Sequence, residues 1–109
     1  MHELGVAMQV VDIVAQRANG ARVKRVVVEV GALTAVLPDA LRFCFDSATE
    51  GTVAEGATLE IIERLARAKC TSCAALLNLD RPFGRCECGC SELEWQSGDE
   101  LRVFEMEVE

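Results

Sequence analysis

The stretch that decides the fold is CTSCAALLNLDRPFGRCECGC, residues 70–90, which holds five of the six cysteines of the chain. Cys70 and Cys73 have the Cys-x-x-Cys spacing that lets two thiolates reach one tetrahedral ion from a tight turn. A second pair facing the first would complete four ligands, and this stretch offers no histidine in place of a sulfur. Tetrahedral thiolate sites favour zinc, with iron as the lesser option. The sequence therefore predicts a metal site, and zinc is the expected ion.

The second pair of ligands must come from Cys86, Cys88 and Cys90, and the spacing leaves the choice open. Gly89 favours Cys88 as the end of its turn, because glycine readily adopts the positive φ that such a turn uses. Four-cysteine sites without an open position usually stabilise a fold and do not catalyse a reaction. We therefore expect a structural zinc site at this cluster.

The residues around the cluster differ in character from the rest of the chain. Residues 66–97 show little hydrophobic periodicity and carry four basic and four acidic side chains. Such a segment buries little apolar area and needs a cross-link to hold it together. We expect it to be a zinc-binding subdomain inserted into a larger domain of residues 1–65 and 98–109.

The larger domain has alternating helical and strand patterns. Apolar residues recur at helical spacing over 4–18 and again after Pro38, whose missing N–H costs nothing in the first turn of a helix. Cys44 falls on the apolar stripe of that second helix, which predicts a core position. Three stretches have the composition of strands, namely 23–30, 57–65 and 100–108. The expected fold is α+β, a small three-stranded sheet with two helices plus an inserted zinc-ribbon-like subdomain.

Composition narrows the class of protein further. The chain has 109 residues, half of them apolar, and a formal net charge of -7, which argues against a nucleic-acid partner. The start lacks the basic region of a signal peptide, and no charge-free run approaches the ~20 residues of a membrane span. These features predict a cytoplasmic protein without a membrane partner.

The first three residues offer a second kind of metal site. His2 is the only histidine of the chain. The α-amine of Met1, the backbone nitrogen of His2 and its imidazole can close fused chelate rings on one ion. Glu3 adds a backbone nitrogen or a carboxylate as a fourth donor. Nitrogen and oxygen donors in a tetragonal plane suit Ni(II) or Cu(II).

Several segments together carry a family resemblance that runs nearly end to end. They are the Met-His-Glu start, the cysteine cluster, VVVEVGALTAVLPDALRFCFD (26–46), GTVAEGATLEI (51–61) and SGDELRVFEMEV (97–108). In these segments the chain resembles the HypA/HybF hydrogenase nickel-incorporation proteins. The resemblance implies a nickel metallochaperone, and therefore a carrier and not an enzyme. It implies delivery of nickel to the large subunit of NiFe hydrogenase, in some organisms also support of urease with its accessory proteins, and work with a HypB-like GTPase.

The resemblance also implies site residues. His2 would be the main nickel ligand, with the Met1 amine and Glu3 beside it. Cys70 and Cys73 would be the first zinc pair. At the second pair this chain departs from the family's Cys-Pro-x-Cys-Gly, because its turn is one residue shorter.

Matching the residues that follow the turn places Cys88 on the family's second cysteine and Cys86 on its first. Cys90 stands where the family usually has a small polar residue, and it could replace either one as a ligand.

Two other functions use the same residues. A zinc ribbon that binds nucleic acid or protein would account for the cluster, but a nucleic-acid module would be expected to have a basic surface and aromatic residues for stacking. A thiol oxidoreductase would use Cys70 and Cys73, but such motifs precede a helix that this sequence does not indicate. We therefore expect a nickel carrier, either monomeric or weakly dimeric.

Overall fold

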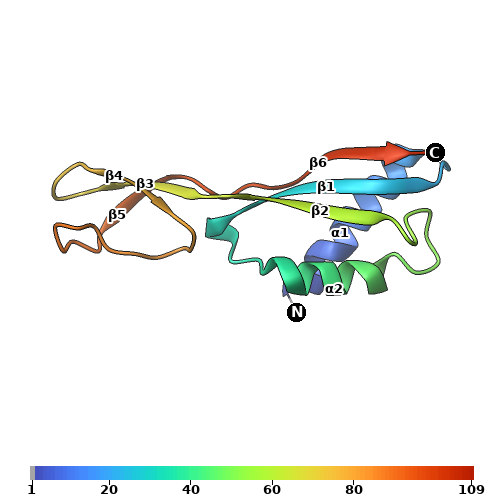
Figure 1. Cartoon of the computed structure of the whole chain (residues 1–109), viewed down its shortest axis with the longest axis horizontal. Coiled ribbons are helices and arrows are strands. Elements are labelled where there is room, and N and C mark those ends of the chain that lie inside the picture. Colours follow the sequence, from blue (N-terminus) through green and yellow to red (C-terminus); the bar gives the residue numbers. More distant parts are fainter. Residues whose placement is uncertain (1) are drawn as a thin grey trace. The chain divides into compact units, whose positions relative to one another are not determined.

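A computed structural model describes residues 2–109, which form two α-helices, a short 3-10 helix and six strands (Figure 1). The helices are α1 (His2–Ala18) and α2 (Pro38–Ala48), and the 3-10 helix η1 is Ala32–Thr34. The strands are β1 (Val23–Gly31), β2 (Thr58–Arg64), β3 (Ala66–Cys70), β4 (Leu76–Leu79), β5 (Leu93–Ser97) and β6 (Leu101–Val108). They form two three-stranded sheets, with strand orders β2-β1-β6 and β4-β3-β5. The expected α+β fold is confirmed.

The chain divides into two compact units. We call the first the helical unit; it comprises Met1–Glu29, Val36–Ile62 and Arg102–Glu109. The second, the cysteine unit, comprises Val30–Ala35 and Glu63–Leu101. The boundaries expected from the sequence, 66 and 97, stay a prediction about which parts of the chain fold independently.

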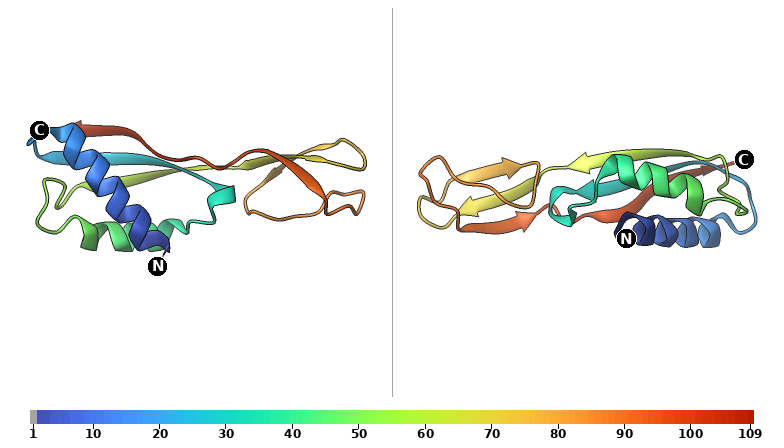
Figure 2. Two further views of the ribbon diagram at one scale, coloured as in Figure 1. Left: turned by 180° about the vertical axis from the view of Figure 1, so that it is seen from behind. Right: turned by 90° about the horizontal axis from the view of Figure 1, so that it is seen from below.

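The helical unit is built around β1, the central strand of its sheet. β1 and β2 run in the same direction, as the chain colours show in Figure 1, and Arg25 near the start of β1 is hydrogen-bonded to Glu60 near the start of β2. The two strands are therefore joined by a crossover, which contains α2. β6 runs the opposite way, because the N–H of Glu109 bonds to the carbonyl of Arg22 just before β1. Helices α1 and α2 pack together and cover the same side of this sheet (Figure 2).

The core of the helical unit is almost wholly aliphatic. α1 buries residues at helical spacing, among them Val10 and Val14, and α2 buries Leu41 and Phe45. Cys44 is buried beside them, as its place on the apolar stripe predicted. The strand β1 is buried along its last six residues, as its central place in the sheet leads one to expect.

The ends of the elements differ from the predictions by a few residues. α1 begins at His2 and not at residue 4, so the candidate nickel residues His2 and Glu3 lie in its first turn. It ends at Ala18, and Asn19 and Gly20 follow with φ of 49° and 88°. Positive φ at two successive residues stops a right-handed helix. No helix in residues 2–109 is long and apolar enough to cross a membrane.

The cysteine unit contains strands that the sequence pattern did not indicate. β3 pairs antiparallel with β4 on one side and with β5 on the other. Its buried residues alternate, but they are Ala66, Ala68 and Cys70. Because these side chains are small, the alternation produces little hydrophobic contrast in the sequence. Two glycines are needed for the close packing of this unit. A Cβ on Gly31 would overlap the backbone of Gly98, which itself has a φ of 123°.

Candidate metal centres

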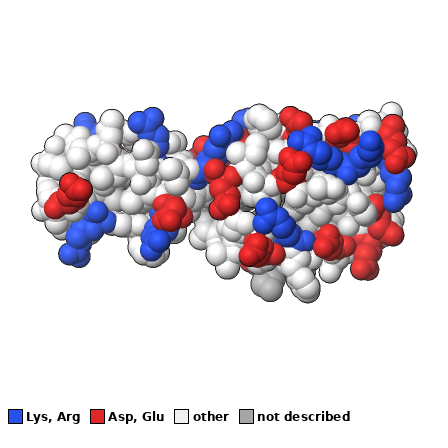
Figure 3. All heavy atoms as spheres, in the orientation of Figure 1, with Lys and Arg blue, Asp and Glu red and all other residues white. Residues whose placement is uncertain are grey.

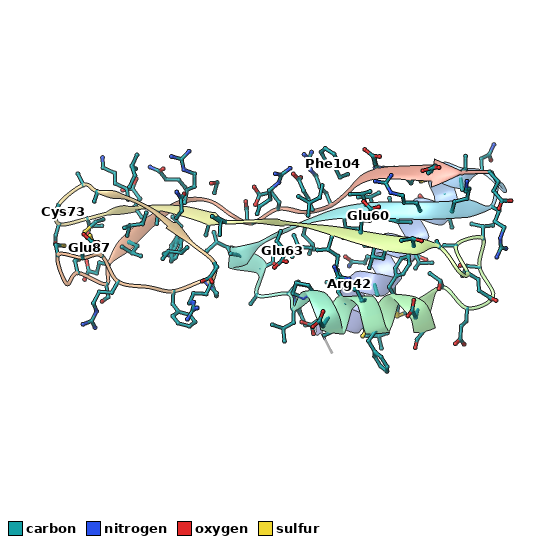
Figure 4. The ribbon with its side chains drawn as sticks, in the orientation of Figure 1. Arg42, Glu60, Glu63, Cys73, Glu87 and Phe104 are labelled. Atoms are coloured by element: carbon teal, nitrogen blue, oxygen red, sulfur yellow. The ribbon has the colours of Figure 1, made fainter. Side chains whose placement is uncertain are left out.

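The first candidate centre is the group of thiols from Cys70, Cys73, Cys86 and Cys88. Their four sulfur atoms all lie within 4.8 Å of one another. The closest pairs are Cys70 with Cys88 at 3.6 Å and Cys73 with Cys86 at 3.5 Å. Zinc–sulfur bonds of about 2.3 Å at tetrahedral angles place neighbouring sulfurs about 3.8 Å apart. The cluster therefore has the dimensions of a four-sulfur metal site (Figure 4, beside Cys73 and Glu87).

Two tight turns present these thiols. In the first, the N–H of Ala74 bonds to the carbonyl of Cys70, and Ala74 adopts a φ of 64°. In the second, the N–H of Gly89 bonds to the carbonyl of Cys86 at 2.8 Å, and Gly89 has the positive φ, 94°, that the sequence suggested. The second turn is closed further by the N–H of Cys86, which bonds to the carbonyl of Cys90. The turn from Cys86 to Cys88 is one residue shorter than a Cys-x-x-Cys turn, and it still brings both thiols into the cluster.

The four thiols need a cation to ionise together. The backbone of Cys90 favours the Cys88 thiolate, but hydrogen bonding to the neighbouring thiols outweighs it and raises the pKa of Cys88 to about 12. Thiolates crowded at this distance repel one another, and a divalent ion between them removes the repulsion. The donors are all soft sulfurs in a tetrahedral arrangement, which favours zinc. The residues present thus fit a zinc ion.

The four clustered cysteines differ in exposure, and Cys90 lies outside their group. Cys70 and Cys86 are buried, with exposures of 1% and 5%, whereas Cys73 and Cys88 are exposed beside a hollow of about 490 Å³. Cys90 is half-buried and outside the group of four, with its sulfur 3.7 Å from the Thr71 hydroxyl. Hydrogen bonding to the Ser72 hydroxyl, then to the Glu92 backbone and Thr71, lowers the pKa of Cys90 to about 7.

The second candidate centre is the N-terminus. Met1, whose amine is a predicted nickel donor, lies outside the described residues. His2 is exposed at the first position of α1. Glu3 follows it but is only 9% exposed, and its carboxylate oxygen Oε2 accepts the backbone N–H of Leu37 at 3.1 Å. This bond is the main reason why the pKa of Glu3 is lowered. The sequence offered no sign of this contact, since the two residues are 34 positions apart.

A charged network on the helical unit was also missed by the sequence analysis. Arg25 donates two hydrogen bonds to the Glu60 carboxylate, at 2.6 and 2.8 Å, and a third to Glu105 at 3.0 Å. The two hydrogen bonds that Arg25 donates to Glu60 are the main reason why the pKa of Glu60 is lowered. Lysine and arginine are interspersed with acidic residues on the face drawn in Figure 3. On this face the basic side chains do not gather into a stripe of one sign.

Comparison with known proteins gives consistent results. Residues 1–108 match the family model described as hydrogenase/urease nickel incorporation, metallochaperone, HypA. The hydrogenase maturation factor HypA of Nostoc punctiforme is 50% identical over 109 residues, which are all of this chain and 96% of that protein. The HypA of Rippkaea orientalis is 52% identical over 110 residues, with the same coverage. The solution structure of the Ni metallochaperone HypA from Helicobacter pylori is similar with a TM-score of 0.67 at 25% identity, covering 99% of this chain and 97% of that one.

Proposed function

Because the chain belongs to the HypA family of hydrogenase/urease nickel-incorporation metallochaperones, we propose that it binds Ni(II) at its own N-terminus and delivers it to a NiFe hydrogenase during maturation. The proposed ligands are the Met1 amine, the backbone nitrogen and imidazole of His2, and Glu3. The family's role in hydrogenase maturation supports the client, and the metal-handling role supports a carrier without a catalytic step.

One observation supports the nickel site most strongly, and it is the position of His2. The only imidazole of the chain lies exposed at the start of α1, one residue from the terminal amine. The first N–H groups of a helix have no acceptor within the helix, so α1 does not consume the backbone nitrogens that a chelate needs. Nitrogen donors in a plane are a preferred set for Ni(II).

We propose that the cysteine cluster holds a structural zinc ion through Cys70, Cys73, Cys86 and Cys88. When bound, the ion would cross-link the two cysteine-bearing turns. The apolar core of the cysteine unit is too small to hold them together. The mutual distances of the four sulfurs support this assignment, and they support Cys86 and Cys88 over Cys90 as the second pair.

The proposed partners follow from the family and from charge. They are a HypB-like GTPase, the large subunit of a NiFe hydrogenase and, where the organism has urease, its accessory proteins. All would be met in the cytoplasm, by a monomer or weak homodimer. The net charge of -7 suits basic patches on such partners. Binding should therefore weaken as salt is added.

The test of the nickel site is calorimetric titration of Ni(II) into the untagged, zinc-loaded protein. We expect His2→Ala to abolish the specific site and to leave zinc content and fold unchanged. One residue added before Met1 should do nearly as much harm, because it moves the amine out of its chelate ring. Wild-type affinity in His2→Ala would refute the N-terminal site.

Delivery is tested by transfer of nickel to the partner. Ni-loaded protein is mixed with a nickel-free hydrogenase large subunit, and the nickel content of that subunit is measured after separation. A competing chelator is present in both reactions. If the subunit gains nickel faster from the loaded protein than from the same concentration of Ni(II) salt, the protein acts as a chaperone. Equal rates would mean that the chain only stores nickel.

A further inference from the structure

The side chain of Glu3 has a structural role that bears on the proposed nickel site. We propose that the Glu3 carboxylate positions the nickel-binding terminus by capping α2. The inference rests on the proposed function, because it concerns how that site is held.

Helix α2 lacks a cap of its own. The first four N–H groups of a helix need acceptors from outside it, and a Ser, Thr, Asp or Asn before the helix usually supplies one. Here that position is Leu37, whose side chain offers no acceptor, and Pro38 follows with no N–H at all. The acceptor is instead the carboxylate of Glu3, which lies in α1 and accepts a hydrogen bond from the Leu37 N–H.

The carboxylate is also costly to move. Glu3 is only 9% exposed, and a carboxylate out of water needs hydrogen bonds to compensate for its lost hydration. If the side chain turned to a nickel ion, the bond to Leu37 would be lost. The start of α2 would then lose the acceptor that Glu3 supplies. A carboxylate committed in this way is a poor choice as a mobile metal ligand.

The same contact restricts the residues that bind nickel. His2 precedes Glu3 directly, so fixing Glu3 against the start of α2 limits the positions open to the His2 imidazole and the terminal amine. A chelating segment that is already held loses less conformational freedom when the ion binds. The capping bond should therefore increase nickel affinity without changing the set of donor atoms.

The experiment compares Glu3→Gln with Glu3→Ala in the full-length, zinc-loaded protein. Three quantities are measured: the dissociation constant for Ni(II), the absorption spectrum of the nickel complex, and hydrogen exchange of the Leu37 amide before nickel is added. Glutamine keeps an oxygen that can accept the Leu37 N–H but loses the charge of the carboxylate. Alanine loses both.

We expect Glu3→Gln to keep the spectrum, the Leu37 protection and an affinity within about twofold of the wild type. Glu3→Ala should keep the spectrum, lose the protection and bind nickel about five- to tenfold more weakly, because the released terminus must be ordered when the ion binds. A changed spectrum in Glu3→Gln would make the carboxylate a ligand and overturn the proposal. Unchanged affinity in Glu3→Ala would overturn the positioning role.

Two further variants keep the outcomes separate. Leu37→Asp in the Glu3→Ala background gives α2 a local cap, so stability should return while nickel affinity stays low. Recovery of affinity as well would mean that the start of α2 matters and the link to α1 does not, which also overturns the proposal. His2→Ala reports on the proposed function itself. If it binds nickel as the wild type does, the site is elsewhere, whatever Glu3 does.

Discussion

The two units of this chain solve the same problem of stability in different ways. The helical unit buries valines, Leu41 and Phe45 between its sheet and its helices. Among the buried residues of the cysteine unit are two alanines and two of the clustered cysteines. Burial of an apolar side chain contributes about 25 cal/mol per Å², so small side chains contribute little. With the proposed zinc site, the first unit depends on its core and the second on the bound ion.

Removal of the metal should have the largest effect on this comparison. Structural zinc contributes about 10–16 kcal/mol of apparent binding free energy in small domains, which far exceeds the small core of the cysteine unit. We expect a chelator to unfold the cysteine unit and leave the helical unit folded. Amide NMR spectra with and without chelator measure this residue by residue. Simultaneous loss of signals from α1 and α2 would contradict the independence of the two units.

The ligands can be separated by a matched pair of variants. Cys88→Ala should lose metal, because its sulfur is one of the four that lie together. Cys90→Ala is the control, since its sulfur lies outside that group. Zinc content after dialysis is the measurement. Equal loss from both variants would show that Cys90 shares in ligation.

A core substitution in the helical unit should have the next largest effect. Phe45 is 1% exposed, and Phe45→Ala should lower the free energy of unfolding by about 3–5 kcal/mol. Phe43 is on the same helix but 76% exposed, so Phe43→Ala is the matched control and should have little effect. Urea titration followed by circular dichroism measures both. Metal content should stay unchanged in each variant, and a loss of metal in Phe45→Ala would show that the units are coupled.

The next prediction concerns the backbone of the cysteine unit. Gly98 has a φ of 123°, and a Cβ there would lie 2.6 Å from the Cα of Ala66. Gly98→Ala should therefore destabilise the cysteine unit by at least the ~1–3 kcal/mol of a strained backbone. Gly5→Ala is the control, because Gly5 lies in α1 with open space around it. It should instead stabilise its helix by about 0.5–1 kcal/mol. Hydrogen exchange of each unit measures the effects separately.

The smallest expected effect is electrostatic. The pKa of Glu60 is lowered by Arg25, so this pair stabilises the fold above the ordinary carboxyl value of 4.5 and stops doing so as the pH falls through the lowered value. Glu60→Gln should slightly lower the melting temperature at pH 7 but not at pH 2. High salt should reduce the difference, because both side chains are partly exposed. Glu63→Gln on the same strand is the control, and a matching loss there would mean that the pair contributes nothing specific.

The sequence predicted those features that depend on local pattern. Periodicity indicated the two helices, the three strands in the sheet of the helical unit and the burial of Cys44. It could do so because α1, α2 and β1 each bury one continuous set of apolar residues. The strands of the cysteine unit escaped, because alanine and cysteine at the buried positions of β3 give a weak alternation. Gly89 favoured Cys88 on local grounds, and the resemblance to a known family indicated Cys86 as its partner.

Contacts between distant residues were not predictable in the same way. Glu3 with Leu37 and Arg25 with Glu105 are separated by 34 and 80 positions. Each depends on how two elements meet in space, which the pattern of either element does not specify. Glu3 is the clearest example, since its place beside His2 predicts a nickel ligand, whereas its contact with the Leu37 N–H has no counterpart in the local pattern.

The position of β6 beside β1 has a consequence for synthesis on the ribosome. The sheet of the helical unit is completed only by Leu101–Val108, at the carboxyl end of the chain. The cysteine unit ends at Leu101, so the four clustered cysteines leave the ribosome before most of β6 does. During that interval the edge of β1 that β6 will cover stays open, and open strand edges promote aggregation. Zinc uptake can therefore precede closure of the sheet, whereas the helical unit is completed only after β6 has emerged.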